Sequence, residues 1–238
     1  MGRRPAPGPN YAAGSPLLHA ETEKMNNLNL RREIITTAQQ FNATGLSVGK
    51  SGNVSARTPE GMLITPSGVP YDDLTPGAIV ETDIHGKPVN RKSMPSSEWR
   101  FHLQIYRSRP AINAIVHVHS PYATAIACTR KGIPAIHYHI ALAGGGSIRC
   151  ARYATFGTEK LARNALKALE GRYACLLANH GQIALGESVS SALGMAREVE
   201  QLARLYCIAR LIGKPVFLEG EEVKINVKKF RSYGRQEE

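Results

Sequence analysis

The run AIVHVHS at residues 114–120 restricts the fold strongly, because it places two histidines one residue apart in an otherwise almost entirely apolar segment. A short apolar run of this kind is typical of a buried β-strand. Side chains at positions i and i+2 of a strand point to the same face, so His117 and His119 should project side by side. Two imidazoles begin a metal site, but further ligands must come from elsewhere in the chain.

The remaining predicted elements form a mixed series of helices and strands. Helices are predicted over 28–44, 95–110 (capped by Ser96 or Ser97, with Glu98 in the first turn), 121–132, 158–171 and 189–213, and strands over 53–57, 61–66, 112–119, 135–140 and 173–186. Because short turns join many adjacent strands, the order favours an antiparallel or mixed sheet with helices packed on it over a repeated βαβ unit.

The composition is that of a soluble globular protein, with 42% hydrophobic and 21% charged residues in 238. We expect a Pro/Gly-rich disordered tail over residues 1–26 and a single domain over 27–238. No run approaches the roughly 20 apolar residues that a membrane span needs, so no membrane association is expected. The four cysteines are widely spaced, which favours free thiols in a reducing cytoplasm.

The basic residues are dispersed although the net charge is +11. They form no basic helix and no basic-aromatic motif, so nucleic acid is not expected as a partner. A small phosphorylated substrate suits the same positive field.

A third histidine, His180 in LLANHGQIAL, lies at a break between two strand-like runs. Gly181 beside it would permit an unusual backbone conformation there. Together with His117 and His119 it would complete a three-imidazole set of the kind that catalytic zinc sites use. His137 and His139 form a second pair with the same spacing, and spacing alone does not choose between the two pairs.

Two turns, SGNVS and TPSG, are rich in glycine and hydroxyl residues. Such turns expose backbone N–H groups and hydroxyls that bind anions such as phosphate, although each could equally be a plain turn between strands. Ser96 and Ser97 would add donors of the same kind.

Seven short motifs occur in one order: SGNVSAR, LITPSGVPYDDL, MPSSEWRFHLQIYRSRP, NAIVHVHS, IPAIHYHIALAGG, YATFGT and LLANHG. Together they resemble the class II aldolase/adducin family over about residues 28–233. The resemblance implies an α/β fold of three layers (αβα) around a largely antiparallel central sheet. It also implies a zinc-dependent lyase, with one Zn²⁺ per subunit, that forms a C4 homotetramer with active sites between subunits.

The resemblance also assigns site residues by position. The implied metal ligands are Glu98, His117, His119 and His180, a choice that leaves out His137 and His139. Glu98 is also the implied catalytic base, and Tyr138 the acid that protonates the aldehyde oxygen. The implied phosphate pocket comprises Gly52, Asn53, Ser67, Gly68, Ser96 and Ser97, and the implied substrate pocket adds Phe156 and, from a neighbouring subunit, Tyr233.

The expected reaction is cleavage of a ketose 1-phosphate to dihydroxyacetone phosphate and an aldehyde. L-fuculose 1-phosphate, which gives L-lactaldehyde, is the first expectation. The alternatives are 5-deoxyribulose 1-phosphate or its methylthio analogue, a sugar-phosphate 4-epimerase, and a non-enzymatic adducin-like interaction domain. His139 departs from the family pattern, which has a non-ionisable residue there, and could tune substrate preference.

Overall fold

The computed structural model describes residues 16–89 and 93–233. The α-helices are α1 (Pro16–Ala43), α2 (Trp99–Ser108), α3 (Pro121–Cys128), α4 (Glu159–Ala168), α5 (Val189–Ile212) and α6 (Gly220–Ser232). The strands are β1 (Asn53–Arg57), β2 (Gly61–Ile64), β3 (Val80–Asp83), β4 (Ala114–Val118), β5 (Ile133–Pro134), β6 (Ser147–Ala151), β7 (Ala174–Leu177) and β8 (Gly181–Gly186). Three short 3₁₀ helices complete the series: η1 (Tyr71–Asp73), η2 (Pro76–Ala78) and η3 (Tyr138–Ala143).

The strands form one sheet in the order β3-β2-β1-β4-β8-β7-β6-β5. Every pair of neighbours in this sheet is antiparallel except β6 and β7, which confirms the expected largely antiparallel sheet. Strand β4 lies between β1 and β8, with His117 opposite Asn53 on one side and Ile183 on the other. The histidine strand is therefore an interior strand of the sheet.

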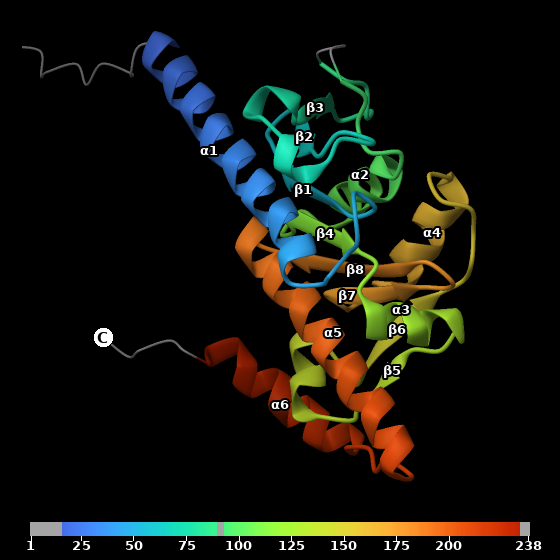
Figure 1. Cartoon of the computed structure of the whole chain (residues 1–238). Coiled ribbons are helices and arrows are strands. Elements are labelled where there is room, and N and C mark those ends of the chain that lie inside the picture. The colour runs from blue at the N-terminus through green and yellow to red at the C-terminus, as the bar shows by residue number, and fades with distance from the viewer. Residues whose placement is uncertain (1–15, 90–92, 234–238) are drawn as a thin grey trace, which may run out of the picture.

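Helices cover both faces of the sheet, with α1 and α5 on one side and α2 and α4 on the other (Figure 1). Alternate residues of β4 pack on opposite faces of the sheet. Val116 belongs to the hydrophobic core formed with α1 and α5, and Ile115 belongs to the core formed with α2 and α4. His117, two residues after Ile115, points to the same face of the sheet. It packs edge-on against Phe101 of α2, with ring centroids 5.4 Å apart. This αβα arrangement confirms the predicted fold class.

Several element boundaries differ from the prediction. Helix α1 begins at Pro16, within the predicted disordered tail; residues 1–15 of that tail lie outside the described residues. The strand predicted over 135–140 is wrong, because β5 ends at Pro134 and η3 begins at Tyr138. The His137 side chain accepts a hydrogen bond from the backbone N–H of His139, and this cap turns the chain. Strands β3 and β6 and helix α6 were not predicted.

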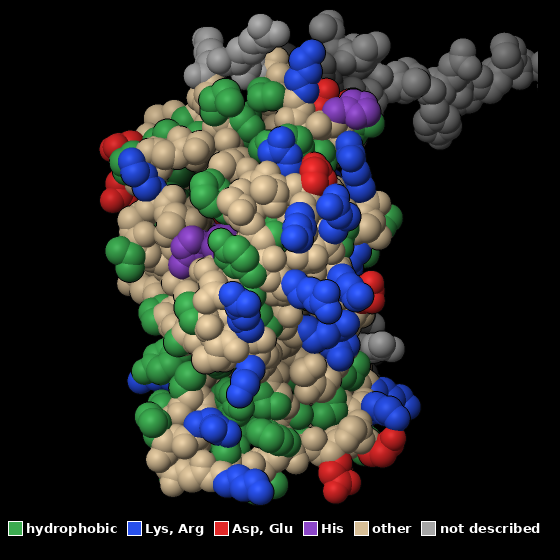
Figure 2. Space-filling view, turned by 90° about the vertical axis from the view of Figure 1, so that its right-hand side faces the viewer, with side chains coloured by type: hydrophobic (Ala, Val, Ile, Leu, Met, Phe, Trp, Pro, Cys, Tyr) green, Lys and Arg blue, Asp and Glu red, His purple; other side chains and the backbone are tan. Residues whose placement is uncertain are grey.

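Basic side chains outnumber acidic ones on the face shown in Figure 2, in keeping with the net charge of +11. Lysine and arginine side chains lie close together over part of that face. Across the described ranges, none of the helices combines the length and apolar character needed to cross a bilayer.

Candidate metal centre and active-site cavity

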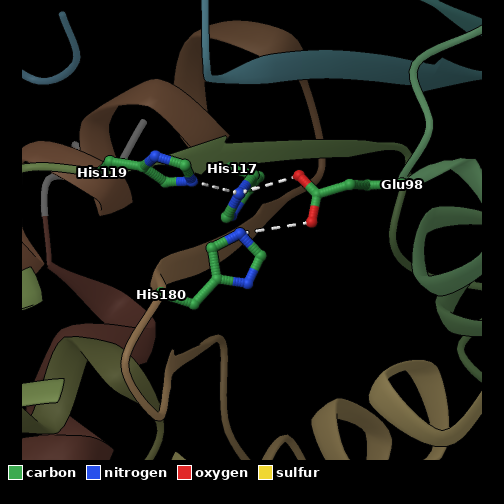
Figure 3. Close-up of side chains that lie close together, drawn as sticks. All are labelled: Glu98, His117, His119 and His180. Carbon is green, nitrogen blue, oxygen red and sulfur yellow. Dashed lines mark hydrogen bonds and ion pairs between the residues drawn. The ribbon is translucent and has the colours of Figure 1, made fainter. Parts of the chain in front are cut away.

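Four predicted metal ligands from three parts of the chain converge on one point (Figure 3). His117 lies in β4 and His119 directly after it, Glu98 immediately precedes α2, and His180 lies between β7 and β8. One ligand atom from each of the four lies within 4.8 Å of every other. The ring centroids of the three imidazoles are 4.9 Å apart in each pair.

The distances within this group fit a divalent cation. His117 Nε2 lies 3.0 Å from both His119 Nε2 and Glu98 Oε2. Ligands about 2.0–2.1 Å from a tetrahedral zinc lie about 3.3 Å apart, close to these separations. Glu98 Oε1 is buried and lies 3.3 Å from His180 Nε2, yet it takes part in no hydrogen bond with a described residue. A buried carboxylate together with three imidazoles is the kind of donor set that such a cation needs.

The tautomer of His117 is fixed by the sheet. Its Nδ1 donates a hydrogen bond to the carbonyl oxygen of Gln182 in β8 over 2.8 Å. This bond leaves Nε2 to face the other ligands, as in many metal-binding histidines. Burial lowers the pKa of His117, but the charge and hydrogen bond of Glu98 raise it more, so the net pKa is raised.

The other two imidazoles are poor bases. Burial, followed by the charge of His117, lowers the pKa of His119 to about 3 and that of His180 to about 4. Both rings are therefore neutral near pH 7, the state in which an imidazole nitrogen binds a metal.

The turn that carries His180 depends on both of its neighbours. Asn179 adopts a left-handed backbone conformation with φ of 53°, which asparagine tolerates better than most residues. Gly181 does not have a positive φ; its role is to leave space. A Cβ atom at Gly181 would lie 2.5 Å from the Val118 carbonyl oxygen and 2.7 Å from Cδ2 of His119.

Glu98 is the N-cap residue of α2 rather than a first-turn residue, and its side chain makes no capping bond. This corrects the prediction that Ser96 or Ser97 caps the helix. Burial raises the pKa of Glu98, but the nearby charges of His117 and His180 and the hydrogen bonds from His117 and Asn53 outweigh it, which lowers the pKa to about 2. The carboxylate is therefore ionised and points into the cluster instead of toward its own helix.

A buried chain of hydrogen bonds leads from Glu98 into the protein core and holds its carboxylate in place. Asn53 Nδ2 donates to Glu98 Oε2 over 3.1 Å, and Asn53 Oδ1 accepts from His102 Nε2 over 2.5 Å. His102 Nδ1 in turn lies 2.7 Å from the hydroxyl of Ser55, which lies 2.7 Å from that of Tyr106. Burial lowers the pKa of His102 to about 3, so its ring is neutral with one donor and one acceptor nitrogen.

A cavity of about 340 Å³ opens beside the cluster. Glu98, His119 and His180 line it, while His117 is fully buried. All six residues of the predicted phosphate pocket line the same cavity, as does Phe156: Gly52, Asn53, Ser67, Gly68, Ser96 and Ser97. Three separate loops thus bring hydroxyl and glycine residues next to the histidines.

Two predicted site residues lie elsewhere in the protomer. Tyr138, in η3, is 46% exposed, and Tyr233, after α6, is 81% exposed; neither lines the cavity. Both rings lie against Phe230 of α6, Tyr138 in a stacked arrangement with centroids 6.0 Å apart. The protomer alone does not bring these tyrosines to the cluster.

The predicted site residues leave out six residues that line the cavity: Lys50, Ser51, Pro66, Tyr153, Ala154 and Asn179. Ser51 is the first residue of the SGNVS turn segment, and Lys50 directly precedes it. Including the whole segment and one residue before it would have found both. Tyr153 lies in the motif YATFGT and Asn179 in LLANHG, but neither was assigned a site role.

Comparisons with known proteins agree with this geometry. The model of the class II aldolase and adducin N-terminal domain matches residues 32–207. The L-fuculose phosphate aldolase of Escherichia coli strain K12 is 48% identical over 211 residues, which cover 88% of this chain and 98% of the relative. The 5-methylthioribulose-1-phosphate/5-deoxyribulose-1-phosphate aldolase of Rhodospirillum rubrum is 46% identical over 209 residues, covering 88% and 94%.

A solved structure of L-fuculose 1-phosphate aldolase has a TM-score of 0.83 at 43% identity, covering 85% of this chain and 96% of that one. These relatives are all aldolases, which speaks against a non-enzymatic interaction domain. The chain belongs to the class II aldolase and adducin family and is an aldolase.

Proposed function

We propose that the protein is a zinc-dependent aldolase that reversibly cleaves a ketose 1-phosphate to dihydroxyacetone phosphate and an aldehyde. The observation that carries this proposal is a single cavity that holds both the Glu98–histidine cluster and the hydroxyl- and glycine-rich loops. A metal–carboxylate centre beside an anion site suits a phosphorylated substrate whose reacting carbons lie near the metal. The positive surface favours the approach of such an anion.

Glu98, His117, His119 and His180 would hold the cation. When bound, the cation supplies Lewis-acid stabilisation of the negative charge that develops at the ketose oxygens. Glu98 can take a proton from the carbon next to the carbonyl in the condensation direction and return it during cleavage. Its buried position and its bond from Asn53 hold the carboxylate in place for this transfer.

The phosphate would bind where the three loops meet, among Ser67, Ser96 and Ser97. The phosphate lies far from the bond that breaks, so its binding energy helps to hold the reacting carbons in place. Tyr138 would act as the acid at the aldehyde oxygen in the cavity of a neighbouring subunit, with Tyr233 completing that pocket. These two roles require the C4 homotetramer that we also propose.

L-fuculose 1-phosphate is our first candidate substrate, with L-lactaldehyde as the product. A second candidate is 5-deoxyribulose 1-phosphate or its methylthio analogue, because the relative that bears those names is 46% identical to the chain, against 48% for the fuculose enzyme. The candidates share the phosphate end and differ at the other end of the sugar, so the cluster and the anion site suit both.

A retro-aldol assay on zinc-loaded protein tests the reaction. Release of dihydroxyacetone phosphate is coupled to NADH oxidation for L-fuculose, L-rhamnulose, 5-deoxyribulose and methylthioribulose 1-phosphates, with a chelator control. We expect chelator-sensitive release, fastest from one of them. Bound metal at one ion per chain with no release from any ketose 1-phosphate would refute the proposal.

Two variants test the assigned base and an assigned metal ligand. Glu98→Gln should keep the fold and lower kcat at least about 100-fold, because the amide cannot accept the proton. His117→Ala should lower the metal content, since it removes the most deeply buried ligand. A fully active Glu98→Gln enzyme, or an undiminished metal stoichiometry in His117→Ala, would contradict the respective assignment.

A further inference from the structure

Lys50 is a cationic residue of the cavity to which the proposed chemistry gives no role. It lies in the loop between α1 and β1, and among the described residues that line the cavity it is the one lysine or arginine. Its Nζ donates a hydrogen bond to the carbonyl oxygen of Gly68 over 2.7 Å. Gly68 lies next to Ser67 in a second cavity loop, so the contact holds the ammonium group at the phosphate side of the cavity.

The ammonium group retains free donor capacity. A lysine Nζ has three N–H donors, and the Gly68 carbonyl takes one of them. Within the described ranges no carboxylate lies within ion-pair distance of Lys50. Two donors and an uncompensated positive charge are therefore available to a ligand.

Among the residues that the structure describes, Lys50 is the single positively charged group at the anion site. The groups around it are the hydroxyls of Ser51, Ser67, Ser96 and Ser97, glycine backbone and the Asn53 amide, and the Asn53 side chain already bonds to Glu98 and His102. A phosphate ester carries close to two negative charges at neutral pH. Moving that charge out of water against neutral donors is costly unless a cation accompanies it.

We propose that Lys50 binds the substrate phosphate and makes the cavity selective for phosphorylated over unphosphorylated ketoses. Held by Gly68, its Nζ donates a charge-assisted hydrogen bond to a phosphate oxygen without leaving the carbonyl. This inference rests on the proposed function, because it assigns the phosphate of the same substrate to the same cavity.

Binding of inorganic phosphate and of dihydroxyacetone phosphate to the metal-loaded protein, measured by calorimetry, tests the assignment. Lys50→Met should raise both dissociation constants about 10- to 100-fold, the effect of losing a charge-assisted bond. Lys50→Arg keeps the charge and should retain most of the affinity, whereas Lys50→Gln, which keeps a donor without the charge, should resemble Lys50→Met. Lys167→Met is the matched control, because Lys167 is exposed on α4 and lies outside the cavity lining.

If Lys50 only tethers its loop to the Gly68 loop, the experiment gives a different result. In that case Lys50→Met would lower the melting temperature while the affinity for phosphate stayed at the wild-type value, and this outcome would overturn the proposal. Absence of phosphate binding by the wild-type protein would overturn it as well.

The two proposals fail in distinguishable ways. Cleavage of a ketose 1-phosphate with an unchanged KM in Lys50→Met removes the role of Lys50 and leaves the aldolase proposal standing. Phosphate binding that depends on Lys50, in a protein that cleaves none of the ketose phosphates, supports the binding site and removes the proposed reaction.

Discussion

At the scale of single residues, Gly181 controls how closely β8 approaches the histidine strand. Its missing Cβ leaves room for the Val118 carbonyl oxygen and the His119 ring, which would lie 2.5 and 2.7 Å from an added methyl group. Gly181→Ala should displace His119 and lower metal affinity about 10- to 100-fold, as changes around metal ligands typically do. Competition with a calibrated chelator measures this effect.

The matched control for this substitution is Gly194→Ala in α5, where an added Cβ would meet no atom within 4 Å. Alanine favours the helix at such a position, so metal affinity should stay unchanged and the melting temperature should stay equal or rise. Equal metal affinity in Gly181→Ala and the wild type would mean that the close approach is not needed for the site.

At the scale of elements, the sequence predicted best where periodicity and end signals coincide. The histidine strand and the long helix ending at Gly213 are examples, since apolar spacing and flanking turn residues define both. The strand predicted over 135–140 failed because a local side-chain cap at His137 overrides β propensity. Glu98 was placed inside the helix because capping statistics favour serine, whereas the carboxylate is bound by distant histidines. Such contacts between remote segments leave no trace in local spacing.

The network behind Glu98 gives α2 a pH-dependent contribution to stability. His102 has a folded-state pKa of about 3, below its ordinary value of 6.5. As pH falls below about 6.5, His102 of the unfolded chain takes up a proton that His102 of the folded chain does not. The contribution of His102 to the free energy of unfolding is therefore fully present above pH 6.5 and decreases toward pH 3. For one such group the loss between pH 7.5 and pH 5 is about 2 kcal/mol.

His102→Gln should remove this part of the pH dependence while it retains an amide that can donate to Asn53. Urea unfolding of chelator-treated wild type and variant, at fixed protein concentration, should show wild type more stable at pH 7.5. The difference should shrink by about 2 kcal/mol at pH 5. Glu98, whose pKa is about 2, loses its contribution only below about pH 4.5 and so does not obscure the comparison. A difference that stays constant over this range would show that His102 is not held neutral by the fold.

At the scale of the whole molecule, the protomer separates two parts of the proposed active site. Glu98, His119 and His180 line one cavity, whereas Tyr138 and Tyr233 lie exposed around Phe230 of α6 and outside that cavity. An exposed tyrosine pair has an apolar body and a polar tip, which suits a subunit contact where the hydroxyl reaches a neighbour's substrate. Sequence resemblance placed these residues in one site, and the fold of a single chain does not join them.

Subunit complementation tests this arrangement. Glu98→Gln and Tyr138→Phe should each be nearly inactive alone, because every site then lacks either the base or the acid. In co-expressed mixed tetramers, a site that takes Glu98 from a Tyr138→Phe chain and Tyr138 from its Glu98→Gln neighbour is intact. Random assembly of equal amounts gives about one intact site in four, so about a quarter of wild-type kcat should return.

The Glu98→Gln/Tyr138→Phe double variant, co-expressed with either single variant, restores no site and serves as the control. Activity no greater than the sum of the two single variants, in tetramers purified through a different affinity tag on each variant, would place Tyr138 outside the neighbouring site.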